Sequence, residues 1–99
     1  MFVVISYDIP DDKRRNEVFK TLKDYGAHVQ YSVFECDLKP EVFRKLRQEL
    51  KEIINKEEDN VRFYVLSEED LKKRRIWGQE RTEAEVRPFY LVRSSGSKE

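Results

Sequence analysis

The stretch of sequence that decides the fold reads Val29-Gln30-Tyr31-Ser32-Val33-Phe34-Glu35-Cys36-Asp37-Leu38. Its apolar side chains stand first at odd positions and then, from Phe34 onward, at even positions. A period-two pattern that changes phase must contain a bulge or a tight turn, because a shift of one residue turns every side chain to the other face of the sheet. The stretch therefore predicts two short strands, or one sharply bent strand, with the break near Ser32 and Val33.

A strand and a helix are expected before this stretch. Phe2-Val3-Val4-Ile5 is a continuous apolar run rich in β-branched residues, which predicts a central strand that is buried on both faces and continues to Asp8. Pro10 and the aspartates that follow it supply a turn and a helix N-cap. Apolar residues then recur at helical spacing until Gly26, which predicts a helix over about residues 11 to 25.

A second helix and a further strand are expected after it. Pro40 fits the first turn of a helix, and a loop over residues 55–60 separates this helix from a strand at 61–66. The order β-α-β-β-α-β predicts an α+β, ferredoxin-like domain, in which two helices cover one face of an antiparallel sheet. The expected buried stripe of the second helix consists of Phe43, Leu46, Leu50, Ile53 and Ile54.

The C-terminal quarter adds elements that this fold does not need. Residues 68–75 are highly charged and are compatible with a helical turn. Phe89-Tyr90-Leu91-Val92 is too apolar to remain in solvent, although the four-stranded sheet is complete without it. We expect a strand at about 86–92 to join an exposed sheet edge, its own or a partner's. One domain is thus predicted over residues 1–92, followed by a flexible polar tail at 93–99.

Composition limits the classes of function. Ninety-nine residues support one core, and charged residues make up 40% of the chain, so burial through self-association is expected to help. Lys plus Arg and Asp plus Glu both number 20, hence any nucleic-acid binding must rest on local clusters. One cysteine permits no internal disulfide, and no apolar run approaches the roughly 20 residues that cross a bilayer. A cytoplasmic protein without a membrane role is expected.

Three fragments occur in a telling order: Tyr7-Asp8-Ile9 followed by the charged residues 11–15, then Tyr25-Gly26, then residues 29–35. Together they resemble the CRISPR-associated protein two family, the small partner of the spacer integrase. The resemblance implies a ferredoxin-like homodimer whose C-terminal strands join the partner's sheet, and membership of the complex that inserts new spacers. It also implies a metal-binding Asp8 near the two-fold axis and a metal-dependent endonuclease activity on RNA or DNA. One position departs from the pattern, because many members have an arginine where this chain has His28.

Asp8 has two interpretations. A charge at the end of an apolar strand is costly to bury unless that end opens to water, a metal or a partner. It can therefore be a simple exposed strand end or helix cap, or it can be the metal ligand that the resemblance implies. Mg²⁺ is usually held by one or two carboxylates together with waters. Two copies of Asp8, related by a dimer axis, would meet that need.

Lys13, Arg14 and Arg15 lie in the first turns of the first helix, where cations oppose the helix dipole. Phosphate binding explains them, and so does a solvated face offset by the neighbouring aspartates. Ser32 at the predicted break could be aimed at a ligand, or could serve the turn itself. The candidate nucleic-acid contacts are Lys13, Arg14, Arg15, His28, Ser32 and Phe34.

The remaining chemistry-bearing residues favour structural roles. His28 can be an ordinary sheet residue, and Cys36, which alternates with apolar neighbours, is expected in the core. The basic run at 72–75 is expected to pair locally with the acidic run at 68–70. Three functions stay open: a nuclease of the adaptation machinery, a DNA-binding scaffold for the integrase, and an unrelated ferredoxin-like domain. The apolar central strand argues against RNA recognition by stacking aromatics.

Overall fold

The computed structural model describes residues 1–79, and they form the predicted β-α-β-β-α-β unit with a short additional helix. Each boundary of the β-α-β-β-α-β unit lies within two residues of its expected position. The C-terminal strand expected at 86–92 and the tail at 93–99 lie outside the described residues. The elements are β1 (Phe2–Asp8), α1 (Asp12–Lys23), β2 (Ala27–Gln30), β3 (Val33–Asp37), α2 (Pro40–Ile53), β4 (Asn60–Leu66) and α3 (Glu68–Lys72).

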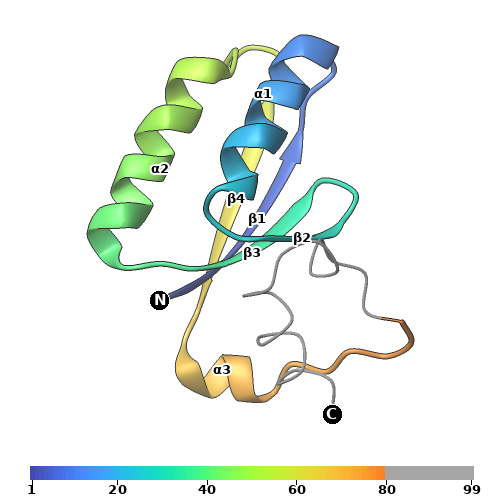
Figure 1. Cartoon of the computed structure of the whole chain (residues 1–99), viewed down its shortest axis with the longest axis vertical. Helices are drawn as coiled ribbons and strands as arrows, with labels where there is room; N and C mark the ends of the chain where they lie inside the picture. The colour runs from blue at the N-terminus through green and yellow to red at the C-terminus, as the bar shows by residue number, and fades with distance from the viewer. Residues whose placement is uncertain (80–99) are drawn as a thin grey trace.

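The four strands form one antiparallel sheet in the order β2-β3-β1-β4. This is the ferredoxin-like order, which confirms the expected fold. Strand β1 pairs with β3 on one side and with β4 on the other, and α1 and α2 cover the same face of the sheet (Figure 1). Within the described residues, no helix is both long enough and apolar enough to span a bilayer.

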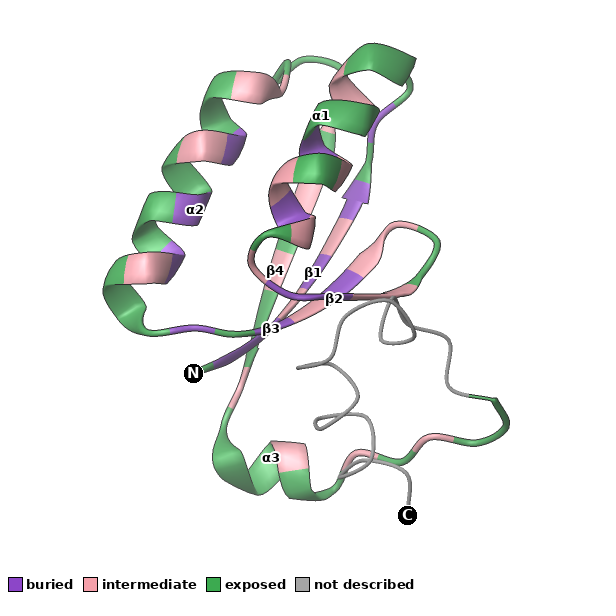
Figure 2. Cartoon of the chain, viewed as in Figure 1, coloured by how far each residue is buried: buried purple, intermediate pink, exposed green. Residues whose placement is uncertain are grey.

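The core lies between the helix pair and the sheet (Figure 2). Val3 and Ile5 of β1 are fully buried against Leu22 of α1 and Leu46 of α2. A fully buried side chain of this kind contributes about 1.5–3 kcal/mol. The expectation that β1 is buried on both faces is only partly right, because Val4 on the opposite face is half-buried.

The break in the 29–38 stretch is confirmed. Strand β2 ends at Gln30, β3 begins at Val33, and the pairing register shifts between His28 and Gln30. Tyr31, in the turn, has a positive φ of 37° and leaves 86% of its side chain exposed. A positive φ is uncommon for a residue other than glycine, so the turn holds Tyr31 in a strained conformation.

The helix N-termini follow the expected signals, whereas α1 ends at Lys23 with Asp24 as its C-cap, shortly before Gly26. The side chain of Asp11 accepts a hydrogen bond from the Arg14 backbone N–H at 2.9 Å and caps α1. Pro40 occupies the first turn of α2, and Ser67 caps α3 by accepting from the backbone N–H of Asp70. The helical turn considered for residues 68–75 is therefore real but ends at Lys72.

Candidate functional site at the end of strand β1

Asp8 is the last residue of β1 and is exposed. Because side chains alternate along a strand, Asp8 faces away from Tyr7 and the helices, on the same side as Val4 and Ser6. Helices α1 and α2 both lie on the other side (Figure 1). Among the residues that the structure describes, Asp8 makes no ion pair. Its carboxylate is therefore free to meet a ligand that approaches the sheet from this side.

Residues of β4 surround Asp8 on this face. Asn60 pairs directly with Asp8 in the sheet register, and its side-chain oxygen accepts a hydrogen bond from the Arg62 guanidinium at 3.1 Å. The nearby side chain of Tyr64 raises the pKa of Arg62. Neither Asn60 nor Arg62 was predictable from the sequence, since strand pairing over 52 positions cannot be read from a local pattern.

Ser32 and Arg15 gather on the other side of the strand end, around Tyr7. The backbone carbonyl of Ser32 accepts from the Tyr7 N–H at 3.1 Å. Burial raises the pKa of the Tyr7 hydroxyl, while a hydrogen bond with the Ser32 side chain and the charge of Arg15 both act to lower it. Arg15 also donates to the carbonyls of Ile9 and Pro10. Ser32 and Arg15, both predicted site residues, thus meet near the end of β1.

Arg14 serves a different purpose from the expected phosphate contact. Its guanidinium donates to Asp59 at 2.8 Å and 3.2 Å and to Glu58 at 2.9 Å. These bonds join the first turn of α1 to the loop before β4. Arg15 likewise forms an ion pair with Asp12. The structure therefore favours the alternative in which acidic neighbours offset these two arginines.

Two further candidates are turned inward. Phe34 is fully buried in the core, where it packs against Phe19 and Tyr7, so the structure does not favour its predicted contact with nucleic acid. The ring of His28 packs edge-on against Phe19 at 4.9 Å, and its Nε2 is hydrogen-bonded to the Tyr31 carbonyl. Both rings stabilise the β2–β3 hairpin.

The basic runs at 13–15 and 72–75 differ in whether their side chains are free to contact a ligand. Lys13 is exposed and forms no ion pair with any other residue in 1–79. In the second run, local pairing was expected, but Arg74 instead forms an ion pair with Glu35 of β3 and lies over the ring of Phe2 at 5.5 Å. The segment after α3 is thereby attached to the sheet face opposite α1 and α2. Cys36 is fully buried in the core, which confirms the structural role predicted for it.

The described residues contain no group of three or more acidic, histidine or cysteine side chains that could hold a metal ion. At the end of β1, the described part of one chain offers the exposed carboxylate of Asp8 beside the carboxamide of Asn60. Magnesium is compatible with one or two carboxylates and several waters. One copy of this strand end is a weak donor set, whereas two copies that face each other would be adequate.

Known proteins match this chain over most of its length. The family model described as CRISPR associated protein Cas2 matches residues 1–74. A CRISPR-associated endoribonuclease Cas2 of Synechocystis is 50% identical over 76 residues, which cover 77% of this chain and 83% of the relative. The crystal structure of Streptococcus pyogenes Cas2 superposes with a TM-score of 0.70 at 35% identity, covering 79% of this chain and all of the other.

One structural match comes from a larger assembly. A chain of a partial Cas6-RT-Cas1–Cas2 complex superposes with a TM-score of 0.69 at 36% identity. The match covers 77% of this chain and 89% of the other.

Proposed function

The chain belongs to the CRISPR-associated protein Cas2 family, and on that premise we propose that it is a cytoplasmic endonuclease subunit of CRISPR adaptation that works as a homodimer. Its substrate is the phosphodiester backbone of RNA or DNA. Its relatives carry the name endoribonuclease, which supports cleavage of a phosphodiester. The proposal assigns Asp8 as the ligand of a divalent cation, Mg²⁺ being the first choice.

The observation that supports this assignment is the position of Asp8. It is an exposed carboxylate at the end of a central strand, on the sheet face that α1 and α2 leave uncovered. If two protomers pack through this face, two Asp8 carboxylates approach each other across the dimer axis. The pair would then supply the two carboxylates that one chain lacks.

A divalent cation bound there would lower the pKa of a bound water and offset the negative charge that develops on the phosphodiester. The protein's own residues bring the substrate to that place. Lys13 is exposed and can contact phosphate, and Arg15, although it is paired with Asp12, keeps 39% of its side-chain surface exposed near the end of β1. Both contacts are electrostatic and independent of base sequence.

A second candidate function is a scaffold that bridges integrase subunits on DNA without hydrolysis. It is favoured by the likeness to a chain of a complex whose description includes Cas1. The presence of a single carboxylate at each strand end is also compatible with an Asp8 that takes no part in chemistry. The two functions share the fold and the dimer and differ in what Asp8 does.

The decisive experiment measures cleavage of labelled RNA and DNA by the purified protein with Mg²⁺ and with EDTA. We expect Asp8→Asn to abolish Mg²⁺-dependent cleavage with little change in melting temperature, because the amide keeps the shape but loses the charge. Asp37→Asn is the control, since Asp37 is also an exposed strand-end aspartate but lies at the opposite end of the sheet, 3.6 Å from the N-terminal amine. Unchanged cleavage by Asp8→Asn would exclude Asp8 as the metal ligand.

A further inference from the structure

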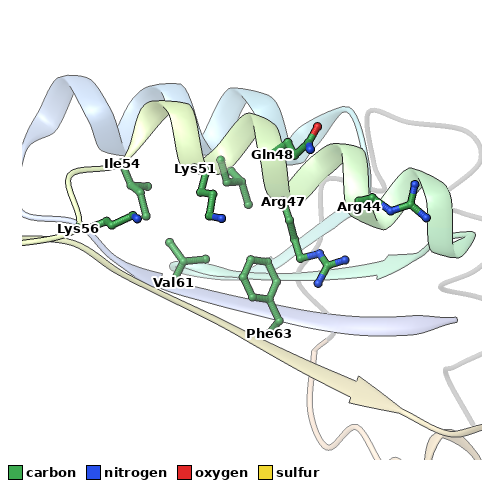
Figure 3. A pocket seen from close by; sticks show the side chains of 9 residues that line it. Arg44, Arg47, Gln48, Lys51, Ile54, Lys56, Val61 and Phe63 are labelled. Atoms are coloured by element: carbon green, nitrogen blue, oxygen red, sulfur yellow. The ribbon is translucent and has the colours of Figure 1, made fainter.

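A groove of about 560 Å³ runs between α2 and the edge strand β4 (Figure 3). It lies on the helix-covered side of the sheet, whereas Asp8 faces the other side. Helix α2 forms the wall of the groove and β4 forms its floor, and β4 pairs only with β1 among the described residues. The residues that line it are Arg44, Arg47, Gln48, Leu50, Lys51, Ile54, Lys56, Val61 and Phe63.

The wall formed by α2 is positively charged. Four of the nine lining residues are cationic and none is acidic. Arg44, Arg47 and Lys51 are spaced by three and four residues, which places them along one side of the helix at rises of about 4.5 Å and 6 Å. Within residues 1–79 none of the four cations forms an ion pair. Like charges so close together repel each other, and an anionic ligand would relieve that repulsion.

The carboxylates of α2 lie elsewhere on the helix. Glu49 accepts a hydrogen bond from the Tyr25 hydroxyl at 3.0 Å, toward α1. Glu41 and Glu52 are exposed and do not line the groove either, so the wall formed by α2 carries cations and no carboxylate.

The floor of the groove is apolar and partly aromatic. Val61 and Phe63 of β4 are half-buried there, and Figure 3 shows Arg47 and Lys51 extending toward them from α2. The ring of Phe63 packs against Phe43, and the guanidinium of Arg47 lies 4.4 Å over the Phe43 ring. Such a floor can accommodate a sugar or the face of a base, while the cations above it contact phosphate.

We propose that this groove binds the sugar-phosphate backbone of single-stranded nucleic acid, RNA or DNA, as a second contact surface remote from Asp8. A single line of cations along one wall matches one backbone. The planar guanidinium groups of Arg44 and Arg47 suit phosphate oxygens in particular. This function goes beyond cleavage at Asp8, because the groove holds the strand and takes no part in bond breaking.

The test measures binding of the full chain to fluorescent single-stranded RNA, single-stranded DNA and duplex DNA, over a range of salt concentrations. The groove variant is Arg47→Gln with Lys51→Gln, and glutamine retains a good helix propensity. The matched control is Lys39→Gln with Lys45→Gln, because both lysines are exposed, lie at or in the same helix and are absent from the groove. Both doubles remove the same charge.

We expect the groove variant to bind either single strand about tenfold more weakly at low salt, with the slope of log affinity against log salt reduced by about 0.7 per lost contact. The control should bind like the unaltered chain. Asp8→Asn should keep full affinity even if it loses cleavage, so the two proposals can fail separately. Phe63→Leu, which removes the aromatic floor at little cost in volume, gives a second measure if the groove variant is unstable, and it should also weaken binding.

Equal affinities and salt slopes for the groove variant and its control would overturn the proposal. The proposal would also be overturned if the groove variant lost more affinity for duplex DNA than for single strands, because the groove would then prefer duplex. A third contrary result would be a groove variant that binds nucleic acid like the unaltered chain but no longer binds a polyglutamate peptide that the unaltered chain does bind. That outcome would identify the groove as a site for an acidic protein segment.

Discussion

Arg14 and Asp59 illustrate, at the scale of single residues, why a basic cluster cannot be assigned to a ligand from its composition. The side chain of Asp59 has no exposed surface, yet it is satisfied by Arg14 and by the backbone N–H of Asn55. Hydrogen bonds from Arg14 lower the pKa of Asp59. Sequence alone predicts a cation at position 14, but the partner lies 45 residues away and becomes its neighbour only in the fold.

This pair leads to a prediction about stability in acid. The pKa of Asp59 is lowered in the folded state, so the ion pair contributes fully above about pH 4 and its contribution is lost as the pH falls through the lowered value. Asp59→Asn should be less stable than the unaltered chain at pH 7. The difference in melting temperature should shrink as the pH falls below about 4.

Thermal unfolding followed by circular dichroism at several pH values checks this expectation. Arg14→Gln should show the same convergence in acid, because it removes the other member of the pair. Lys13→Gln is the control, being exposed and free of ion pairs with the described residues. Melting curves of the unaltered chain and Asp59→Asn that stay equally far apart at all pH values would contradict the assignment.

At the scale of elements, the sequence predicts the positions of helices and strands better than it predicts the partners of individual charged side chains. The change of phase in residues 29–38 located the β2–β3 turn, and the apolar spacing after Pro40 located α2 with Phe43, Leu46 and Leu50 buried. These signals are local, because alternation and helical spacing follow directly from backbone geometry. The attachment of Arg74 to Glu35 was not predictable, since it depends on how the segment after α3 passes over the sheet.

Gly26 provides a test of packing between elements. It was expected only to end the helix, but the structure gives it a second role: a Cβ there would lie 2.4 Å from Cys36 Sγ and 2.5 Å from the Glu35 carbonyl oxygen. Two of the clashing atoms, the Glu35 carbonyl oxygen and Cys36 Cα, belong to the backbone, and a backbone shift costs more free energy than a side-chain rotation. Gly26→Ala should therefore lower the free energy of unfolding by about 1–3 kcal/mol.

Urea denaturation measures that loss as a lower midpoint with an unchanged slope. Lys20→Ala, an exposed change on α1, should stay within about 0.5 kcal/mol of the unaltered chain. A Gly26→Ala protein as stable as this control would mean that β3 and the residues before β2 separate more easily than the close approach implies.

At the scale of the whole molecule, α1 and α2 cover one face of the sheet, whereas within residues 1–79 no such helix pair covers the other face, on which Arg74 meets Glu35 (Figure 2). Tyr64 on β4 is 48% exposed, and Val4 beside it in the register is half-buried. A chain of 99 residues with 40% charged side chains gains from burying such a surface in a dimer. We expect the apolar segment 89–92 to provide a further means of association.

We therefore predict that the C-terminal segment contributes to a homodimer. Ending the chain after Glu85 removes Phe89 to Val92 and should yield a monomer or an aggregate instead of a dimer. Light scattering coupled to size exclusion measures the mass directly. A truncated chain that remains a well-folded dimer would show that the sheet face alone holds the protomers together, and the strand-exchange hypothesis would be abandoned.

The last prediction separates a nuclease from a scaffold, and it concerns the assembled molecule in cells. If the dimer acts as a scaffold, binding to duplex DNA comes from cation–phosphate contacts and falls steeply with salt, because binding releases counterions. Lys13→Gln with Arg15→Gln should then weaken duplex binding and reduce the salt slope by about one unit per lost contact. Arg14 is left intact, since its loss would disturb the loop that contains Asp59.

Spacer acquisition in cells is then compared between this double variant and Asp8→Asn, with Asp37→Asn as the control for a lost strand-end charge. A scaffold predicts that the double variant fails and that Asp8→Asn acquires spacers normally, because a carboxylate adds nothing to the affinity for phosphate. A nuclease whose cleavage is needed for acquisition predicts that Asp8→Asn fails although its folding and DNA affinity are unchanged. Failure of Asp8→Asn alone would defeat the scaffold, because no loss of binding could then explain the loss of acquisition.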